Sequence, residues 1–277
     1  MESYLLLILL GVGIGTLGTL IGAGGGFILV PVLILLYPTM KPESLTAVSL
    51  AIVMVNAWVG TWAYYRKRRI DFKAGIIFAI STIPGSILGV FLTTVIPRGQ
   101  FDILFGIVLT VLALFLFIGG GKKEKKDKTL RAIQPNFTFQ QITDKNGVHY
   151  EYAYRIKTGI ILSLLIGFFS PLFGIGGGII HVPAMTELLH FPVHIATATS
   201  QFVLGIMAMV SVIVHYFQGS YDNSENLTLI FTLGLGVIPG ALLGARISNV
   251  VKGKIIIRIL SISLGIIGLR IIYSAVM

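Results

Sequence analysis

The chain has 277 residues and a net charge of +10, with 55% hydrophobic and only 12% charged residues and a mean hydropathy of +0.91. Soluble domains usually carry about 25% charged residues, so the composition excludes an ordinary soluble globular protein. The basic residues gather in loops between apolar stretches, so we attribute them to orientation in a membrane and expect no nucleic-acid partner.

Eight mostly apolar stretches follow one another along the chain. Each has, or nearly has, the roughly 18 residues that a helix needs to cross a bilayer core. They are residues 4–21, 45–63, 74–96, 103–118, 159–173, 195–214, 227–243 and 255–272. The first stretch lacks the basic start and cleavage site of a secretory signal, so we expect it to be retained as a helix. We therefore predict an all-α polytopic membrane protein embedded in the lipid bilayer.

A glycine-rich stretch occurs twice in the chain. Gly-Ala-Gly-Gly-Gly-Phe-Ile-Leu-Val-Pro at residues 22–31 corresponds to Gly-Ile-Gly-Gly-Gly-Ile-Ile-His-Val-Pro at residues 174–183. The alignment continues in the same order, with offsets from 151 to 155, at residues 46–49 with 197–200 and 83–89 with 238–244. Several matched blocks in one order indicate an internal duplication.

The duplication defines three parts of the chain. We expect a first transmembrane repeat at residues 1–120, a polar linker at 121–156 and a second transmembrane repeat at 157–277. Each repeat then holds five apolar segments. The second of these segments, at residues 27–37 and 179–190, is short and follows the glycine run.

The charge pattern changes sides between the two repeats. Residues 66–69 form a dense basic loop, whereas the corresponding residues 218–225 are acidic and polar. The basic residues of the second repeat come one loop later, at Arg246, Lys252, Lys254 and Arg258. Because Lys and Arg are enriched in cytoplasmic loops, we place residues 66–73 and 121–156 in the cytoplasm and predict inverted-topology repeats, as in secondary transporters. If both short segments are re-entrant, each repeat has four crossings and the inversion is lost, and this alternative stays open.

The linker contains a hairpin signal. Asn146-Gly147 lies between two alternating segments, residues 137–142 and 148–156. Asn-Gly favours a tight hairpin turn, so we expect a small cytoplasmic β-hairpin. Its simplest interpretation is a connector between the repeats.

The duplicated blocks resemble a known family. Gly-Ala-Gly-Gly-Gly-Phe-Ile-Leu-Val-Pro followed by Ala47-Val-Ser49, its second copy with Ala198-Thr-Ser200, and the two Ile-Pro-Gly blocks are similar to the sulfite exporter TauE/SafE family. The resemblance covers nearly the whole chain apart from the linker. It implies a transporter of small anions, especially sulfite, sulfonates such as sulfoacetate, and other organosulfur compounds.

The glycine runs are the first candidates for an anion site. The short segments that follow them would be helices of roughly 16 to 18 Å, too short to cross a bilayer core. A helix that begins at mid-depth presents unpaired N–H groups, and glycine lets an anion approach them closely. The site residues on this hypothesis are Gly24, Gly25, Gly26, Gly176, Gly177 and Gly178. The alternative is close helix packing, for which Gly11, Gly13, Gly15 and Gly18 are the stronger candidates.

Polar residues inside apolar segments are the next candidates, because they are costly there and often functional. His181, three residues after the second glycine run, is the proton-coupling candidate and a donor to an anion. Neutral donors to substrate oxygens would be Ser49, Ser200, Thr46, Thr197, Thr199, Gln201 and Asn56. The alternatives are a structural histidine and hydroxyls bonded back to their own helices.

Several chemistries find no support in the sequence. There is no cysteine, no nucleophile–base–acid set and no nucleotide-binding motif, so we expect neither an enzyme nor a bound cofactor or metal. We predict a secondary transporter of the inner or plasma membrane that exports anions by alternating access, driven by the proton gradient or the membrane potential. A passive anion channel is the alternative. Both a monomer and a homo-oligomer are compatible with the sequence.

Overall fold

The computed structural model describes residues 4–119, 137–248 and 253–276. The first repeat contributes five helices, each built from one of the apolar segments. They are α1 (Tyr4–Ile21), α2 (Gly26–Leu36), α3 (Pro42–Tyr65), α4 (Phe72–Thr93) and α5 (Arg98–Gly119). The second repeat contributes α7 (Ile156–Phe173), α8 (Gly178–Pro183) with a π-helical turn η1 (Ala184–Leu188), α9 (Val193–Phe217), α10 (Ser224–Ile247) and α11 (Gly253–Val276).

Among the described residues, six helices are long and apolar enough to cross a membrane: α1, α3, α4, α7, α9 and α10. The all-α polytopic class predicted from the sequence is confirmed. The two short segments form helices that are interrupted or brief. Helix α2 has 11 residues, while α8 has 6 residues before η1 continues for 5 more. Each begins directly after its glycine run.

The helices pair across the two repeats in an equivalent way. Helix α1 packs on α10, and its counterpart α7 packs on α4, the counterpart of α10. Helices α3 and α9 pack on each other, as do α5 and α11. Neither repeat therefore forms a core alone, since each covers its apolar faces with helices of the other.

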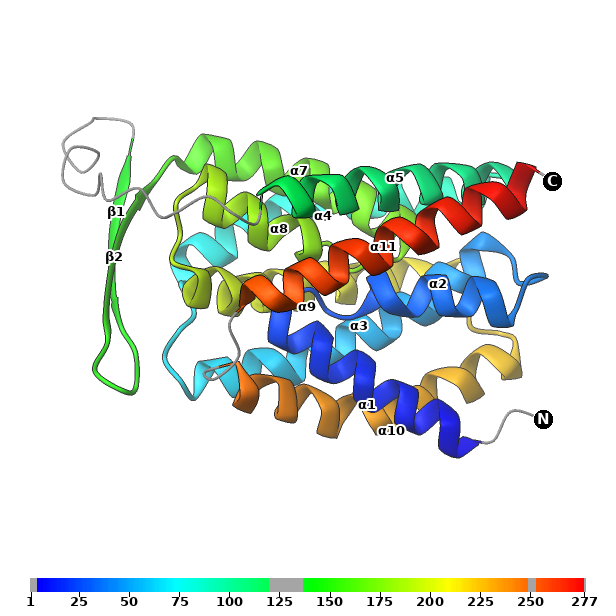
Figure 1. Ribbon diagram of the computed structural model, residues 1–277, viewed down its shortest axis with the longest axis horizontal. Coiled ribbons are helices and arrows are strands. Elements are labelled where there is room, and N and C mark those ends of the chain that lie inside the picture. Colours follow the sequence, from blue (N-terminus) through cyan, green and yellow to red (C-terminus); the bar gives the residue numbers. More distant parts are fainter. Residues whose placement is uncertain (1–3, 120–136, 249–252, 277) are drawn as a thin grey trace.

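The helices of the two repeats run in opposite directions. Both chain termini lie at one end of the bundle, and the β-hairpin lies at the other end (Figure 1). Helix α1 runs away from the end that carries the N-terminus, whereas α7 starts beside the hairpin and runs back toward the termini (Figure 1). This is the arrangement that an inverted repeat requires.

Glycines permit the closest helix pairs. On α10, a methyl group at Gly236, Gly240 or Gly244 would collide with a backbone carbonyl of α1. Gly85 and Gly89 of α4 lie in the same way against carbonyls of α7. These glycines include those of the two Ile-Pro-Gly blocks, so the blocks mark helix crossings. Of the glycines assigned to packing on α1, Gly11 and Gly15 contact α10, but Gly13 faces open space, so packing does not account for it.

A matched pair of substitutions on α10 tests these crossings. Gly236→Ala places a methyl group against the carbonyl of Ile8 and is expected to destabilise the fold by about 1–3 kcal/mol. Gly234→Ala meets no atom within 4 Å and is expected to be neutral or to stabilise the helix by up to about 1 kcal/mol. Thermal unfolding in detergent micelles measures both. Equal unfolding temperatures for the two variants would contradict the proposed role of the crossing.

The linker contains an antiparallel hairpin of β1 (Thr138–Thr143) and β2 (His149–Tyr154), with Thr143 paired to His149 at the turn. The carboxylate of Asp144 accepts bonds from the N–H groups of Asn146 and Val148, and Gly147 takes a positive φ of 79°. Asn-Gly thus supplies the turn chemistry. The preceding part of the linker, at residues 121–136 with its run of lysines, lies outside the described residues.

Candidate functional site

The two glycine runs contact each other between the repeats. A methyl group at Gly26 would collide with the carbonyl of Gly174, and one at Gly178 would collide with the carbonyl of Gly22. The two contacts are equivalent, because Gly26 aligns with Gly178 and Gly22 aligns with Gly174. The glycines therefore allow two backbone loops to approach more closely than any other residue would permit.

Two equivalent serines hold the glycine loops. The hydroxyl of Ser49 on α3 donates to the carbonyl of Gly174 at 2.6 Å, and that of Ser200 on α9 donates to the carbonyl of Gly22 at 3.0 Å. Both serines are fully buried. Each serine thus fixes the loop of the other repeat, so both predicted residues lie at the glycine seam, where they satisfy backbone carbonyls.

The start of α2 carries buried N–H groups that have no acceptor among the described residues. The N–H groups of Ile28 and Leu29 donate to the carbonyl of Gly25, at 3.1 Å each. No such bond is made by Gly25, Gly26 or Phe27, although all three residues are buried. Helix starts normally satisfy these groups with a side chain, water or a ligand. Such a helix start is chemically suited to an anion.

The start of α8 differs from that of α2. The hydroxyl of Ser170 on α7 accepts a bond from the N–H of Gly177, and the N–H of Gly178 donates to the carbonyl of Gly176. The residue equivalent to Ser170 in the first repeat is Gly18, which has no hydroxyl to offer. The expected pair of equal helix starts is therefore unequal. At α8 the N–H groups of Gly177 and Gly178 have acceptors and only that of Ile179 lacks one among the described residues, whereas at α2 all three equivalent N–H groups lack one.

Asn56 and Gln201 lie beside the uncapped loop. The amide of Asn56 donates to the carbonyl of Gly24 at 3.0 Å and accepts a bond from the hydroxyl of Thr19. The amide of Gln201 donates to the carbonyl of Gly18 at 3.1 Å. Its oxygen is buried and has no hydrogen-bond partner among the described residues. Both predicted residues are thus at the seam, where Asn56 bonds to the loop backbone and Gln201 bonds to the backbone near the end of α1.

The hydroxyls of Thr46 and Thr199 bond away from the glycine loops, whereas Thr197 contacts one of these loops. The hydroxyl of Thr46 bonds within α3, to the carbonyl of Pro42 at 3.0 Å, and lies 3.3 Å from Nε2 of His215. The hydroxyl of Thr199 accepts a bond from the N–H of Asp71 at 3.0 Å. Thr197 contacts Gly22 through its methyl group and backbone. The hydroxyl of Thr46 therefore forms its contacts near the start of α3, and that of Thr199 forms its contact near the start of α9.

His181 lies on α8 and is 2% exposed. Its Nε2 atom is 3.4 Å from the hydroxyl of Ser163 on α7, and its ring lies 6.1 Å from the ring of Phe78. The side chain is therefore directed toward α7 and α4.

Two buried side chains, those of Ser170 and His215, were not among the residues predicted from the sequence. Ser170 caps Gly177, and comparing it with its counterpart Gly18 could have indicated the difference between the repeats. His215 is fully buried at the end of α9, with Nδ1 3.1 Å from the hydroxyl of Ser220 and Nε2 beside Thr46. Its position three residues before the acidic loop of residues 218–225 did not indicate burial in the sequence.

Comparisons with known proteins show the family to which the chain is related. A family model described as sulfite exporter TauE/SafE matches residues 7–271. The chain is 33% identical to the probable membrane transporter protein YunE of Bacillus subtilis, over 99% of both chains. It is 28% identical to a probable membrane transporter protein of Methanocaldococcus jannaschii, over 95% of this chain and 93% of the relative. No solved structure matches the chain significantly.

Proposed function

The chain belongs to the sulfite exporter TauE/SafE family and is a multi-pass membrane transporter, and we propose that its cargo is a small sulfur-containing anion moved by alternating access. Sulfite, sulfonates such as sulfoacetate, and related organosulfur anions are the proposed substrates. The observation that carries this proposal is the buried start of α2, with three N–H groups that have no acceptor among the described residues. An oxyanion would accept those bonds without requiring a positively charged side chain.

Positive charge supports an orientation with the hairpin in the cytoplasm. The basic residues near the hairpin are those of the loop of residues 66–69, Lys145, Arg155 and Arg246. Lys145 lies in the hairpin turn and bonds to Lys67, Arg155 directly follows β2, and Arg246 is adjacent to Ala245, whose carbonyl accepts a bond from Lys67. Cytoplasmic ends of membrane proteins are enriched in such residues. We therefore propose that residues 66–73 and 121–156 are cytoplasmic in the cell membrane. Lys252 lies outside the described residues, and the side chains of Lys254 and Arg258 are not described.

The seam between the repeats favours a carrier over a passive channel. The glycine loops meet backbone to backbone, and Ser49 and Ser200 bond them across the repeats. An ion can pass such a seam only if the two repeats move relative to each other. Alternating access is a movement of this kind.

Binding and transport assays test the proposal directly. Purified protein is titrated with sulfite, thiosulfate and sulfoacetate, and uptake into proteoliposomes is measured for every anion that binds. A carrier is expected to show saturable uptake that is accelerated by counterflow, whereas a channel would show a current without saturation. The absence of binding by all three anions would overturn the proposed cargo class.

His181 is the proposed proton-coupling residue, and a neutral isostere tests it. Gln in place of His181 retains a hydrogen-bonding group beside Ser163 but cannot titrate near neutral pH. If His181 carries the coupled proton, H181Q transport is expected to lose its dependence on the pH gradient while anion binding is retained. Transport with an unchanged pH dependence would assign His181 a structural role.

A further inference from the structure

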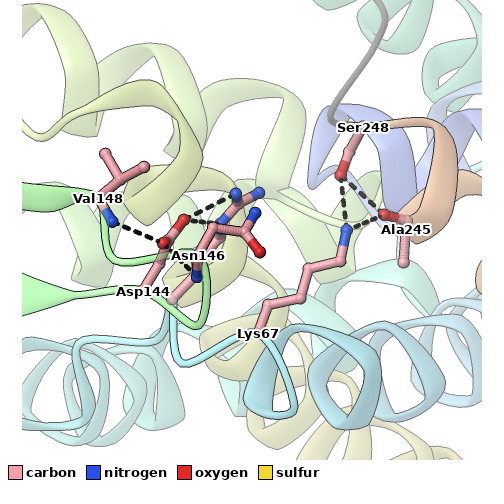
Figure 2. A network of polar contacts seen from close by, with 7 residues as sticks. Lys67, Asp144, Asn146, Val148, Ala245 and Ser248 are labelled. Atoms are coloured by element: carbon pink, nitrogen blue, oxygen red, sulfur yellow. Dashed lines mark hydrogen bonds and ion pairs between the residues drawn. The ribbon is translucent and has the colours of Figure 1, made fainter.

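The hairpin is fixed to the loop between α3 and α4 by a buried ion pair. Nη2 of Arg69 lies 2.9 Å from Oδ2 of Asp144, and Nε lies 3.1 Å from the same oxygen. The two side chains are 6% and 1% exposed. A backbone bond of 3.0 Å from the N–H of Lys145 to the carbonyl of Lys67 lies next to the pair. Figure 2 shows this contact between the hairpin turn and the loop.

Both carboxylate oxygens of Asp144 accept hydrogen bonds, one from Arg69 and the other from the backbone of the turn. Its second oxygen accepts the N–H groups of Asn146 and Val148, at 2.8 and 3.1 Å. Burial opposes the charged carboxylate, but the hydrogen bonds from Arg69, Val148 and Asn146 outweigh it and lower the pKa of Asp144 below its ordinary 3.8. The ion pair is therefore fully formed at neutral pH.

A second connection leads from the hairpin to α9. The hydroxyl of Tyr152 donates to Oδ2 of Asp71 at 2.7 Å, and Oδ1 of Asp71 caps the start of α4 by accepting the N–H of Ala74. The N–H of Asp71 donates to the hydroxyl of Thr199. Thr199 is adjacent to Ser200, which holds the glycine loop of the first repeat. Hydrogen bonds and the backbone thus link the hairpin to the seam.

Aromatic packing adds to these bonds. The rings of Tyr152 and Tyr154 lie 4.6 and 4.8 Å from the ring of Phe191, which leads into α9. The same buried cluster contains Met185 of η1 and Phe78 of α4. The hairpin therefore contacts the broken helix of the second repeat as well as the loop of the first.

The loop that the hairpin holds lies over the start of α9 and the end of α10. Ile70 packs with Ala198 and Ala245 in one buried cluster. The ammonium group of Lys67 donates to the carbonyl of Ala245 and lies 3.4 Å from the hydroxyl of Ser248, both at the end of α10 (Figure 2). Residues 66–71 thus close one end of the α3–α9 pair.

The opposite end of the α3–α9 pair has an equivalent closure without a hairpin. There the loop after α9 covers the start of α3: the hydroxyl of Tyr221 donates to the carbonyl of Ala47 at 3.1 Å. Ala47 corresponds to Ala198 in the alignment of the repeats, and both are fully buried. In the part of the chain that the structure describes, the only strands are β1 and β2, and they lie at the other end.

We propose that the hairpin is a strap that holds residues 66–71 closed over α9, with the Arg69–Asp144 pair as its latch. Release of this strap then regulates opening of the seam from the hairpin side. This inference rests on the proposed alternating access for its consequence in transport, whereas the closure itself is tested independently of any cargo.

The absence of cysteine from the sequence makes this closure directly measurable. Ala198→Cys reports exposure beneath the strapped loop, and Ala47→Cys reports the equivalent position at the other end. Labelling rates with a water-soluble maleimide are compared in purified detergent-solubilised protein, with and without D144N. We expect D144N to raise the labelling rate at position 198 by roughly tenfold or more, because one partner of a buried ion pair is lost.

Matched controls separate the latch from general damage to the hairpin. E151Q removes a charge from the exposed face of the same hairpin, where Glu151 bonds to Gln141, and is expected to leave labelling unchanged. Combining D144N, whose amide oxygen can still accept the N–H groups of Asn146 and Val148, with Arg69→Met removes the unpaired buried charge and is expected to slow labelling at position 198 again. Unchanged labelling in D144N, or an equal increase in E151Q, would overturn the strap.

The same experiment distinguishes the strap from the transport mechanism. Faster labelling at position 198 together with slower labelling at position 47 supports both the strap and alternating access. Faster labelling at position 198 with no change at position 47 supports the strap and contradicts a coupled opening and closing of the two ends.

Discussion

A methyl group at Gly25 is expected to weaken anion binding at least about tenfold, equivalent to about 1.4 kcal/mol, whereas one at Gly177 is expected to have a much smaller effect. Both glycines precede a short helix and have positive φ, 88° and 27°. The difference between them is the state of the N–H groups. Ser170 already occupies the N–H of Gly177, while those of Gly25, Gly26 and Phe27 have no acceptor among the described residues.

This comparison is measured by titrating each purified variant with the anion that binds the natural protein. Gly99→Ala is the control for a glycine replacement, because a methyl group there meets no atom within 4 Å. Thermal unfolding verifies that the Gly25→Ala protein is folded, since its methyl group would lie 2.5 Å from Cγ2 of Ile14. Equal losses at Gly25 and Gly177 would favour a symmetric site formed by both helix starts. Unchanged binding in the folded Gly25→Ala variant would remove the helix start of α2 from the site.

Replacement of Arg69 by alanine is expected to detach the hairpin, at a cost of about 3–5 kcal/mol in docking free energy. The cost arises because Asp144 would keep its charge in a buried position after losing its bonds from the guanidinium of Arg69. Hydrogen exchange is expected to accelerate in β1 and β2, while the amides of α4 and α7 stay protected. Loss of protection throughout the bundle would instead show that the pair stabilises the whole fold.

The double variant Arg69→Met with Asp144→Leu completes the cycle. It replaces the ion pair by apolar side chains of similar size and removes the uncompensated charge, but it also removes the acceptor of the Asn146 and Val148 N–H groups, so only part of the protection of the hairpin is expected to return. Arg98→Ala is a matched control, because Arg98 pairs with Asp102 at 2.8 Å in a more exposed salt bridge far from the hairpin. Loss of that pair is expected to leave the hydrogen-exchange protection of the hairpin unchanged.

Much of the architecture could be predicted from local patterns. The long apolar segments correspond to helices because a bilayer requires every backbone group to bond within its own segment. Asn146-Gly147 indicated the turn at which β1 and β2 meet, since few residues other than glycine adopt the positive φ found there. The glycine runs marked the points at which α2 and α8 begin.

The candidate site was predictable in position but not in detail. Ser49, Ser200, Asn56 and Gln201 do gather at the glycine seam, as residues near the duplicated blocks were expected to do. Three of their hydrogen bonds run to backbone carbonyls of the glycine loops, and that of Gln201 runs to the carbonyl of Gly18 in α1. The residue type shows that a side chain can donate a hydrogen bond, but its acceptor is the carbonyl that the fold brings within about 3 Å.

By itself, the sequence determined the class of the protein, its duplication and the places where its helices break, because these follow from apolar length, repeated blocks and glycine. Only the tertiary structure decided that the two repeats cover each other and that the glycine loops meet backbone to backbone. It also decided that α8 is capped by Ser170 while the start of α2 is uncapped, and that the hairpin holds the α3–α4 loop through Arg69 and Asp144. These features join residues far apart in the chain, and such contacts depend on three-dimensional proximity that no local pattern contains.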